Sequence, residues 1–149
     1  MDPTRQQVRL GAVLALAEKQ HGVVSRTQLL DLGLSSDAIR YRQARGRLHP
    51  VRRGVYAVGR PRVTRLGELM AAVLACGPGA TLSGEAAAEV HGVRRQHPGP
   101  IDVTVPGGAR HLPGVRLRRT ALAESERVVR RRLPVTSVLR TLMDLAPAL

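Results

Sequence analysis

The sequence predicts an α+β protein with two parts, at residues 1–62 and 66–149, joined by a basic linker at about residues 59–65. Three observations support this. In the first part, apolar residues recur with helical spacing and the runs end at glycines. Two short β-prone runs then flank an Arg-Arg-Gly turn. In the second part, helix-like and strand-like segments follow one another without an internal repeat, as expected of a small mixed α/β domain.

The first helix is expected over residues 4–20, with Gly22 as the stop signal. Its apolar positions keep broadly helical spacing; they are Val8, Val13, Leu14, Leu16 and Ala17.

Two short helices with clear start signals follow. Ser25 stands three residues before Gln28, which is the spacing of a capping box. Ser35 or Ser36 can cap the next helix, and Asp37 suits the positive end of its dipole. A glycine ends each helix, so the pair has helix-turn-helix spacing.

A β-hairpin is expected next, because the runs LHPV and VYAV flank the turn RRG over residues 48–58. Pro50 cannot donate a backbone hydrogen bond and must therefore lie on an edge strand. Three helices followed by a two-stranded hairpin form a winged helix-turn-helix, and this combination is far more specific than either half alone.

The second part is expected to be a small mixed α/β domain with a β-hairpin and flanking helices. A helix is expected at 66–76, and Ser83 is expected to cap a second helix that runs to Val90. Strands are expected at 101–106 and 115–120, joined by residues 107–114, and a last helix begins at Ser137.

The composition indicates a polyanionic partner. The chain of 149 residues carries a formal charge of +13, with a pI near 11.7. Lys19 is the only lysine, so a coding bias can explain arginine in place of lysine. It does not explain 24 basic residues against 11 acidic ones. Duplex DNA is favoured over single strands, because Tyr41 and Tyr56 are the only aromatic residues available for stacking on bases.

A helical wheel places the candidate base-reading residues opposite Ile39, the expected core residue of the third helix. The side opposite Ile39 carries Asp37, Arg40, Tyr41, Ala44 and Arg45, whereas Gln43 is expected to be partly buried. Arginine can donate two parallel hydrogen bonds to guanine. Arg40 is therefore the first candidate for base readout and Arg45 the second, with Tyr41 as a packing or phosphate contact.

The remaining candidates are expected to contact the DNA backbone. They are Arg26, Ser35, Ser36, Arg42, Arg47 and the pair at the hairpin tip, Arg52 and Arg53, which could also reach a minor groove. The plainer alternative is a solvated charged face, which is the usual explanation of a run of charges.

No catalytic, cofactor or metal motif is apparent, so we expect a protein that is not an enzyme. Ser83 lacks a nucleophile elbow, and residues 77–84 lack the Gly-Lys-Ser/Thr ending of a P-loop. His91 and His97 do not have zinc-site spacing with the single Cys76. A leader and a membrane span are not evident, and a cytoplasmic location is expected.

The segment HGVVSRTQLLDLGLSSDAIRYRQARGRLHPVRRGVYAVG resembles the N-terminal winged helix of AbiEi antitoxins of type IV toxin–antitoxin systems. GATLSGEAAAEVHG, IDVTVPGGARHLPGVRLRRT and LPVTSVLRTLMDLA are similar to segments that follow in many members. The resemblance implies a recognition helix at Ser36 to Arg45 and a wing at Leu48 to Val58. Many similar proteins continue into a restriction-endonuclease-like domain, which this chain lacks; a natural short form and a truncation both remain open.

The family resemblance implies a regulator that represses its own operon and a C-terminal domain that opposes a nucleotidyltransferase-like toxin. We therefore expect sequence-specific binding to duplex DNA near the protein's own gene. The alternative is an interaction module that docks a toxin or nuclease partner without specific DNA readout. Fold alone cannot decide between these functions.

Overall fold

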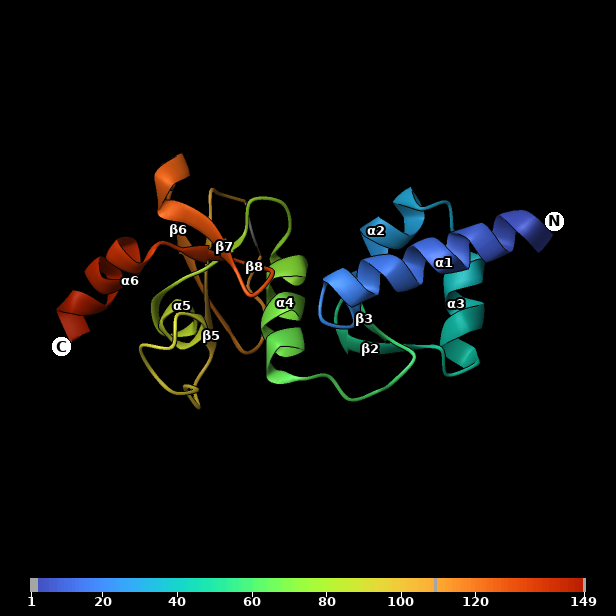
Figure 1. The fold of residues 1–149 in the computed structure, drawn as a ribbon, viewed down its shortest axis with the longest axis horizontal. Coiled ribbons are helices and arrows are strands. Elements are labelled where there is room, and N and C mark those ends of the chain that lie inside the picture. The colour runs from blue at the N-terminus through green and yellow to red at the C-terminus, as the bar shows by residue number, and fades with distance from the viewer. Residues whose placement is uncertain (1–2, 109, 149) are drawn as a thin grey trace. The chain divides into compact units, whose positions relative to one another are not determined.

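The computed structural model describes residues 3–108 and 110–148, which form two compact units (Figure 1). The first unit spans Met1–Ala75 and the second Cys76–Leu149. The helix that we expected to open the second domain, α4 (Arg65–Cys76), thus falls almost entirely within the first unit.

The first unit contains a winged helix. Its elements are α1 (Pro3–Lys19), β1 (Val23–Ser25), α2 (Arg26–Asp31), α3 (Ser36–Ala44), β2 (Leu48–Arg52), β3 (Val55–Val58) and α4. The strands form an antiparallel sheet in the order β1-β3-β2. Pro50 therefore lies on an edge strand, as predicted, whereas β1 was not predicted as a strand.

The core of the winged helix brings α1, α2, α3 and the hairpin together. Its buried residues are Val13, Ala17, Val24, Leu29, Leu34, Ile39, Leu48 and Tyr56. The predicted capping box holds the start of α2: Ser25 Oγ accepts from the Gln28 N–H at 3.1 Å, and Gln28 Oε1 accepts from the Ser25 N–H at 2.9 Å. The amide of Gln20 extends this network with a 2.9 Å bond to Gln28 Oε1.

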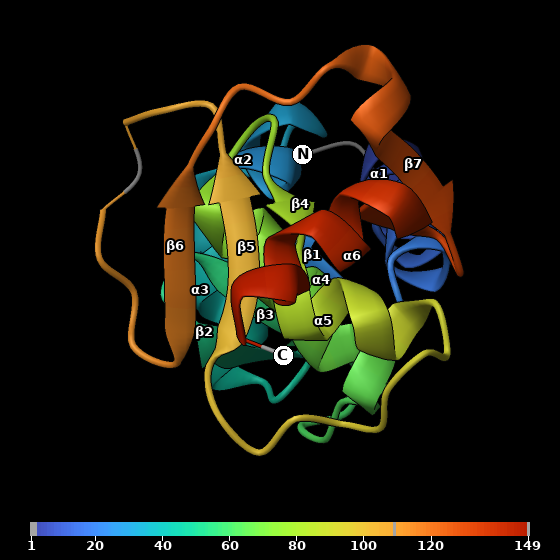
Figure 2. The same ribbon diagram turned by 90° about the vertical axis from the view of Figure 1, so that its left-hand side faces the viewer.

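The second unit is a five-stranded mixed sheet with helices (Figure 2). Its elements are β4 (Thr81–Leu82), α5 (Gly84–Val90), β5 (Ile101–Val105), β6 (Val115–Arg119), η1 (Glu124–Glu126), β7 (Arg127–Arg130), β8 (Leu133–Thr136), α6 (Val138–Leu145) and η2 (Ala146–Ala148). The strand order is β6-β5-β4-β8-β7, and α5 packs on β5 and β8 and against α6.

The expected strands β5 and β6 both form, but they run parallel rather than as a hairpin. The hairpin of this unit is β7–β8, whose first strand was not predicted. Every residue of β5 is buried. Of its two neighbours in the sheet, β4 runs antiparallel to β5 and β6 runs parallel to it. Because β5 and β6 are parallel, the chain between them must cross from the end of β5 back to the end of the sheet at which β5 began, and a tight hairpin turn cannot make this connection.

Ser83 is the N-cap residue of α5, but its side chain does not cap the helix, contrary to our expectation. Its hydroxyl accepts from Thr104 Oγ1 at 2.8 Å, and both residues are buried. The carboxylate of Asp102 supplies the cap in its place, accepting from the Glu85 N–H at 2.9 Å. Cross-strand pairing thus overrides the local capping preference of serine.

Candidate nucleic-acid interface

Helix α3 contributes one fully buried residue to the core, Ile39, which is 1% exposed, and the partly buried Ala38 packs against the same core. Ser35 starts the helix, since its hydroxyl accepts from the Ala38 N–H at 3.1 Å. The side of α3 opposite Ile39 consequently faces outward. In a winged helix this is the side that enters the major groove.

The outward face contains the residues that the wheel placed there. Asp37, Arg40, Tyr41, Ala44 and Arg45 are all exposed, and Arg42 at the flank is half-buried. The expectation for Gln43 was wrong, because its side chain is exposed. Helix α3 ends at Ala44, one residue after Gln43. The next residue that is buried in the core after Ile39 is Leu48 of β2, so Gln43 has no core to pack against.

Two contacts on this face orient the candidate base-reading arginines. Arg40 Nη1 lies 3.9 Å from Asp37 Oδ1, with side chains 80% and 92% exposed, so this is a weak ion pair in solvent. The Arg45 guanidinium lies over the Tyr41 ring at 5.1 Å from its centroid. Both arginines thus keep hydrogen-bond donors available for a ligand, and only Arg45 packs against a neighbouring side chain.

Arg26 joins the starts of α2 and α3 to the hairpin. Its Nη2 donates to Ser36 Oγ at 2.8 Å, and its backbone N–H donates to the Gly54 carbonyl at 2.8 Å. A serine hydroxyl has one hydrogen and two lone pairs, so Ser35 and Ser36 each accept one bond and can still donate to a phosphate oxygen. Arg26 therefore links the start of α3 to the turn of the hairpin.

The hairpin tip presents its arginines through a glycine turn. Arg52 pairs with Val55 across the hairpin, and Arg53 and Gly54 form the turn. Gly54 has φ +76, a conformation that L residues rarely adopt. Arg53 is exposed and Arg52 is half-buried, so Arg53 extends further into solvent.

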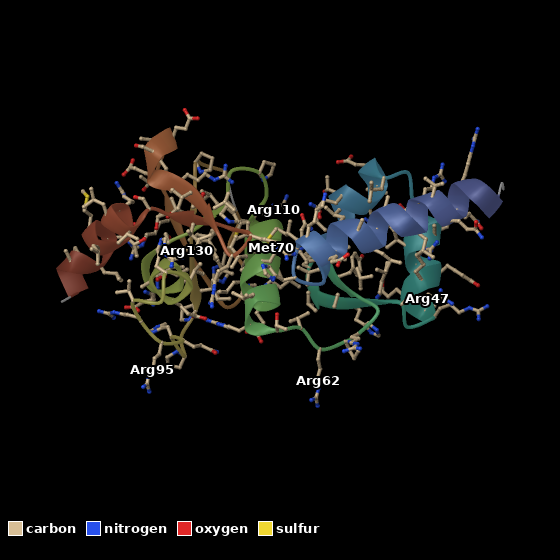
Figure 3. The ribbon with its side chains drawn as sticks, in the orientation of Figure 1. Arg47, Arg62, Met70, Arg95, Arg110 and Arg130 are labelled. Atoms are coloured by element: carbon tan, nitrogen blue, oxygen red, sulfur yellow. The ribbon has the colours of Figure 1, made fainter. Side chains whose placement is uncertain are left out.

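A hollow of about 560 Å³ lies beside α3 and contains a residue that sequence reasoning missed. Its lining includes Tyr41, Arg42, Arg45 and Arg47 together with Arg9 from α1. Arg47, labelled in Figure 3, follows α3 and is exposed. The signal for Arg9 was present in the sequence, because Arg5 and Arg9 stand four residues apart and share one side of α1.

This face can donate many hydrogen bonds and carries almost exclusively positive charge. Arginine forks can bind guanine edges or phosphates, whereas Asp37 is the one acid on the outward side of α3. Within residues 3–108 and 110–148, no three His, Cys, Asp or Glu side chains gather as a metal ion would require. No helix in that same part of the chain is long and apolar enough to cross a membrane.

A comparison with known protein families gives a match within the first unit. Residues 12–59 match the family described as "Transcriptional regulator, AbiEi antitoxin", which confirms the resemblance inferred from the sequence. No curated protein matches the chain.

Among solved structures, the chain is similar to the crystal structure of the RV2827C protein from Mycobacterium tuberculosis, with a TM-score of 0.52 and 23% identity. The match covers 98% of this chain and 61% of that one, so this chain spans less than two thirds of the length of the solved protein. At this identity the similarity establishes the fold.

Proposed function

We propose that this protein is a transcriptional regulator that binds duplex DNA sequence-specifically, because residues 12–59 match the family described as "Transcriptional regulator, AbiEi antitoxin". The observation that carries the proposal is the joined basic surface of α3 and the hairpin. Exposed Arg40 and Arg45 stand on the helix face opposite Ile39, and Arg26 ties the hairpin turn to the start of that helix.

Each candidate residue has a defined role in this proposal. Arg40 reads a guanine edge, and Arg45, held against Tyr41, reads a second position or a phosphate. The backbone contacts come from residues around these two: Arg26, Ser35, Ser36, Arg42, Arg47, Arg52 and Arg53. Phosphate contacts set the register and supply affinity, while Arg40 and Arg45 supply the sequence preference.

The regulated DNA is an operator near the protein's own gene, and the protein acts in the cytoplasm as an autorepressing antitoxin. In this setting a nucleotidyltransferase-like toxin is its protein partner, and the protein has no catalytic activity of its own. Such a regulator needs operator affinity well above its affinity for other DNA, because genomic sites are in large excess.

Fluorescence anisotropy with two labelled duplexes tests the proposal. One duplex carries the DNA upstream of the gene and the other a scrambled sequence, and both are titrated across a salt series. We expect a preference of roughly a thousandfold that persists as salt rises. Equal binding to both duplexes that disappears with salt would contradict sequence-specific readout.

One observation favours the alternative function, a module that docks a protein partner. Helix α6 exposes Leu139 at 70%, Met143 at 57%, Leu142 at 45% and Val138 at 44%. An apolar helix face of this kind suits a toxin surface. A partner that copurifies through a high-salt wash, from a protein with no duplex preference, would support this function over the first.

A further inference from the structure

The winged helix contains an apolar cavity of about 230 Å³, which we call the core cavity. Its aliphatic walls include residues of α1, of α2, of the α2–α3 connection and of the hairpin: Leu10, Val13, Leu14, Leu29, Leu34 and Leu48. Four of them, Val13, Leu29, Leu34 and Leu48, belong to the core of the winged helix, whereas Leu14 is exposed. The core cavity therefore reaches from the core to the surface.

A cavity of this size is unusual in a core, because protein interiors contain few voids larger than a water molecule. Composition favours such a void here. The chain contains no phenylalanine or tryptophan, and Tyr56 is the one aromatic residue among the described residues of this core. An aliphatic cavity excludes water and takes up small apolar molecules. The core cavity is thus suited to an apolar ligand.

Two arginines stand at the core cavity. Arg42 and Arg47 are the only polar side chains among the described residues that line it. Their main chains are fixed, because the Arg47 N–H donates to the Arg42 carbonyl at 2.9 Å and the Gly59 N–H donates to the Arg47 carbonyl at 2.8 Å. In residues 3–108 and 110–148, no carboxylate forms an ion pair with either guanidinium. Their positive charges are therefore available to an anionic group.

The core cavity shares Leu34, Arg42 and Arg47 with the hollow of about 560 Å³ beside α3. The hollow adds Arg9 and Arg45, so an anionic head at this boundary meets several guanidinium groups. An aliphatic wall with a few placed charges is complementary to a ligand with an alkyl chain and an anionic head. A cavity of about 150 Å³ holds benzene, so by proportion one of about 230 Å³ holds a chain of roughly eight carbons.

We propose that the core cavity binds a medium-chain fatty acid, with the alkyl chain in the cavity and the carboxylate on Arg42 and Arg47, and that this ligand weakens DNA binding. The effect on DNA rests on the proposed function, in which these two arginines contact phosphates. A bound carboxylate accepts the hydrogen bonds that the arginines otherwise donate to DNA. Ligand and duplex therefore weaken each other's binding by the same factor.

Calorimetric titration of the whole protein with sodium octanoate tests the site in the absence of DNA. The matched probes are octanol, which keeps the chain without the charge, and sodium acetate, which keeps the charge without the chain. We expect octanoate to bind at least roughly tenfold more tightly than octanol, because hydrogen bonds to charged groups are the stronger ones, and acetate to give no saturable heat. If octanoate gave no saturable heat, or if either probe bound as tightly as octanoate, the inference would be overturned.

The position of the chain is tested with Leu10→Phe, whose larger side chain takes up space in the core cavity and should abolish octanoate binding. The control is Leu30→Phe, which makes the same change at an exposed residue of α2 outside the cavity and should leave octanoate affinity unchanged. Thermal melting of both variants shows whether each is folded. Wild-type octanoate affinity in a folded Leu10→Phe protein would overturn the inference.

The position of the carboxylate is tested with a variant that does not depend on packing. Arg47 is exposed, so Arg47→Gln should fold normally, weaken octanoate binding roughly tenfold and leave octanol binding unchanged. Arg62→Gln removes the same charge from an exposed residue outside the cavity, and its octanoate affinity should match wild type. An equal loss in the two variants would mean that octanoate responds only to net charge, and the site would be refuted.

Anisotropy with the duplex from upstream of the gene tests the effect on DNA. Saturating octanoate should lower the affinity of the wild type and make the slope of log affinity against log salt shallower by roughly 1 to 2, for one or two arginines withdrawn from phosphates. The folded Leu10→Phe protein should bind DNA like wild type with or without octanoate. Wild-type DNA affinity that octanoate does not change would overturn the inference and leave the proposed function intact. A wild type that binds no duplex would overturn the proposed function, while calorimetry would still decide the fatty-acid site.

Discussion

Replacement of Arg40 by alanine should reduce sequence preference without destabilising the protein. The side chain is 80% exposed, and its Nη1 lies 3.9 Å from Oδ1 of Asp37, whose side chain is 92% exposed. A pair so open to solvent contributes at most about 1 kcal/mol to folding. Almost the whole effect of the substitution should therefore fall on DNA recognition.

The expected magnitude follows from the chemistry of one arginine–guanine contact. A bidentate pair discriminates against the wrong base by about 1–3 kcal/mol. Since about 1.4 kcal/mol corresponds to a factor of ten, the ratio of operator to scrambled affinity should fall roughly 5- to 150-fold. Affinity for the scrambled duplex should change little, apart from the small electrostatic effect of one lost charge.

The assay is a competition titration with operator duplexes mutated at one base pair at a time. Loss of Arg40 should make the protein indifferent to the base at one position and leave its preferences elsewhere intact. The matched control is Arg62→Ala, which removes the same charge from an exposed position outside the winged-helix elements (Figure 3). If Arg40→Ala and Arg62→Ala weakened both duplexes by the same factor, Arg40 would be only a phosphate contact.

Three further substitutions test other parts of the structure. Alanine at both Arg52 and Arg53 should weaken all duplexes alike and make the salt slope shallower by roughly 1 to 2; unchanged binding at every salt concentration would refute the wing assignment. Ile39→Ala should cost about 2–5 kcal/mol of unfolding free energy in urea titration, because the side chain is 1% exposed; a cost below 1 kcal/mol would mean that α3 is not fixed by this residue. Glu126→Gln tests pH dependence: the Ala123 N–H and then Arg140 lower the pKa of Glu126 below its ordinary 4.5. The wild-type advantage in thermal stability should therefore be present above pH 4.5 and disappear as pH falls through the lowered pKa, and an advantage that persists in strong acid would contradict this cause.

The elements that sequence predicted well are those specified by neighbouring residues. The bonds of the α2 capping box join Ser25 and Gln28, which are three residues apart, so their spacing alone was sufficient. The orientation of α3 followed from one apolar residue, Ile39, in an otherwise polar helix. The roles proposed for the arginines on that face remain predictions.

What sequence did not predict depends on partners distant along the chain. Strand β1 has only three residues and exists because it pairs with β3, whose first residue is Val55. Strands β5 and β6 are recognisable individually, but their parallel direction is set by the order of the whole sheet. The turn at Arg131 and Arg132 lacks the glycine or asparagine by which such turns are recognised.

The edge strands of both sheets bear on how this protein avoids association with itself. An unpaired strand edge can accept a strand from another molecule, and this is a common route to aggregation. On β2, Pro50 removes one backbone donor, and the irregular register between Pro50 and Arg52 interrupts the regular pairing pattern. On β6 and β7 the deterrent is electrostatic, because two copies brought edge to edge would place like-charged arginines opposite one another. An arginine-rich edge thus repels an identical edge, so the charges that give the chain its high pI also oppose edge-to-edge association of its sheets.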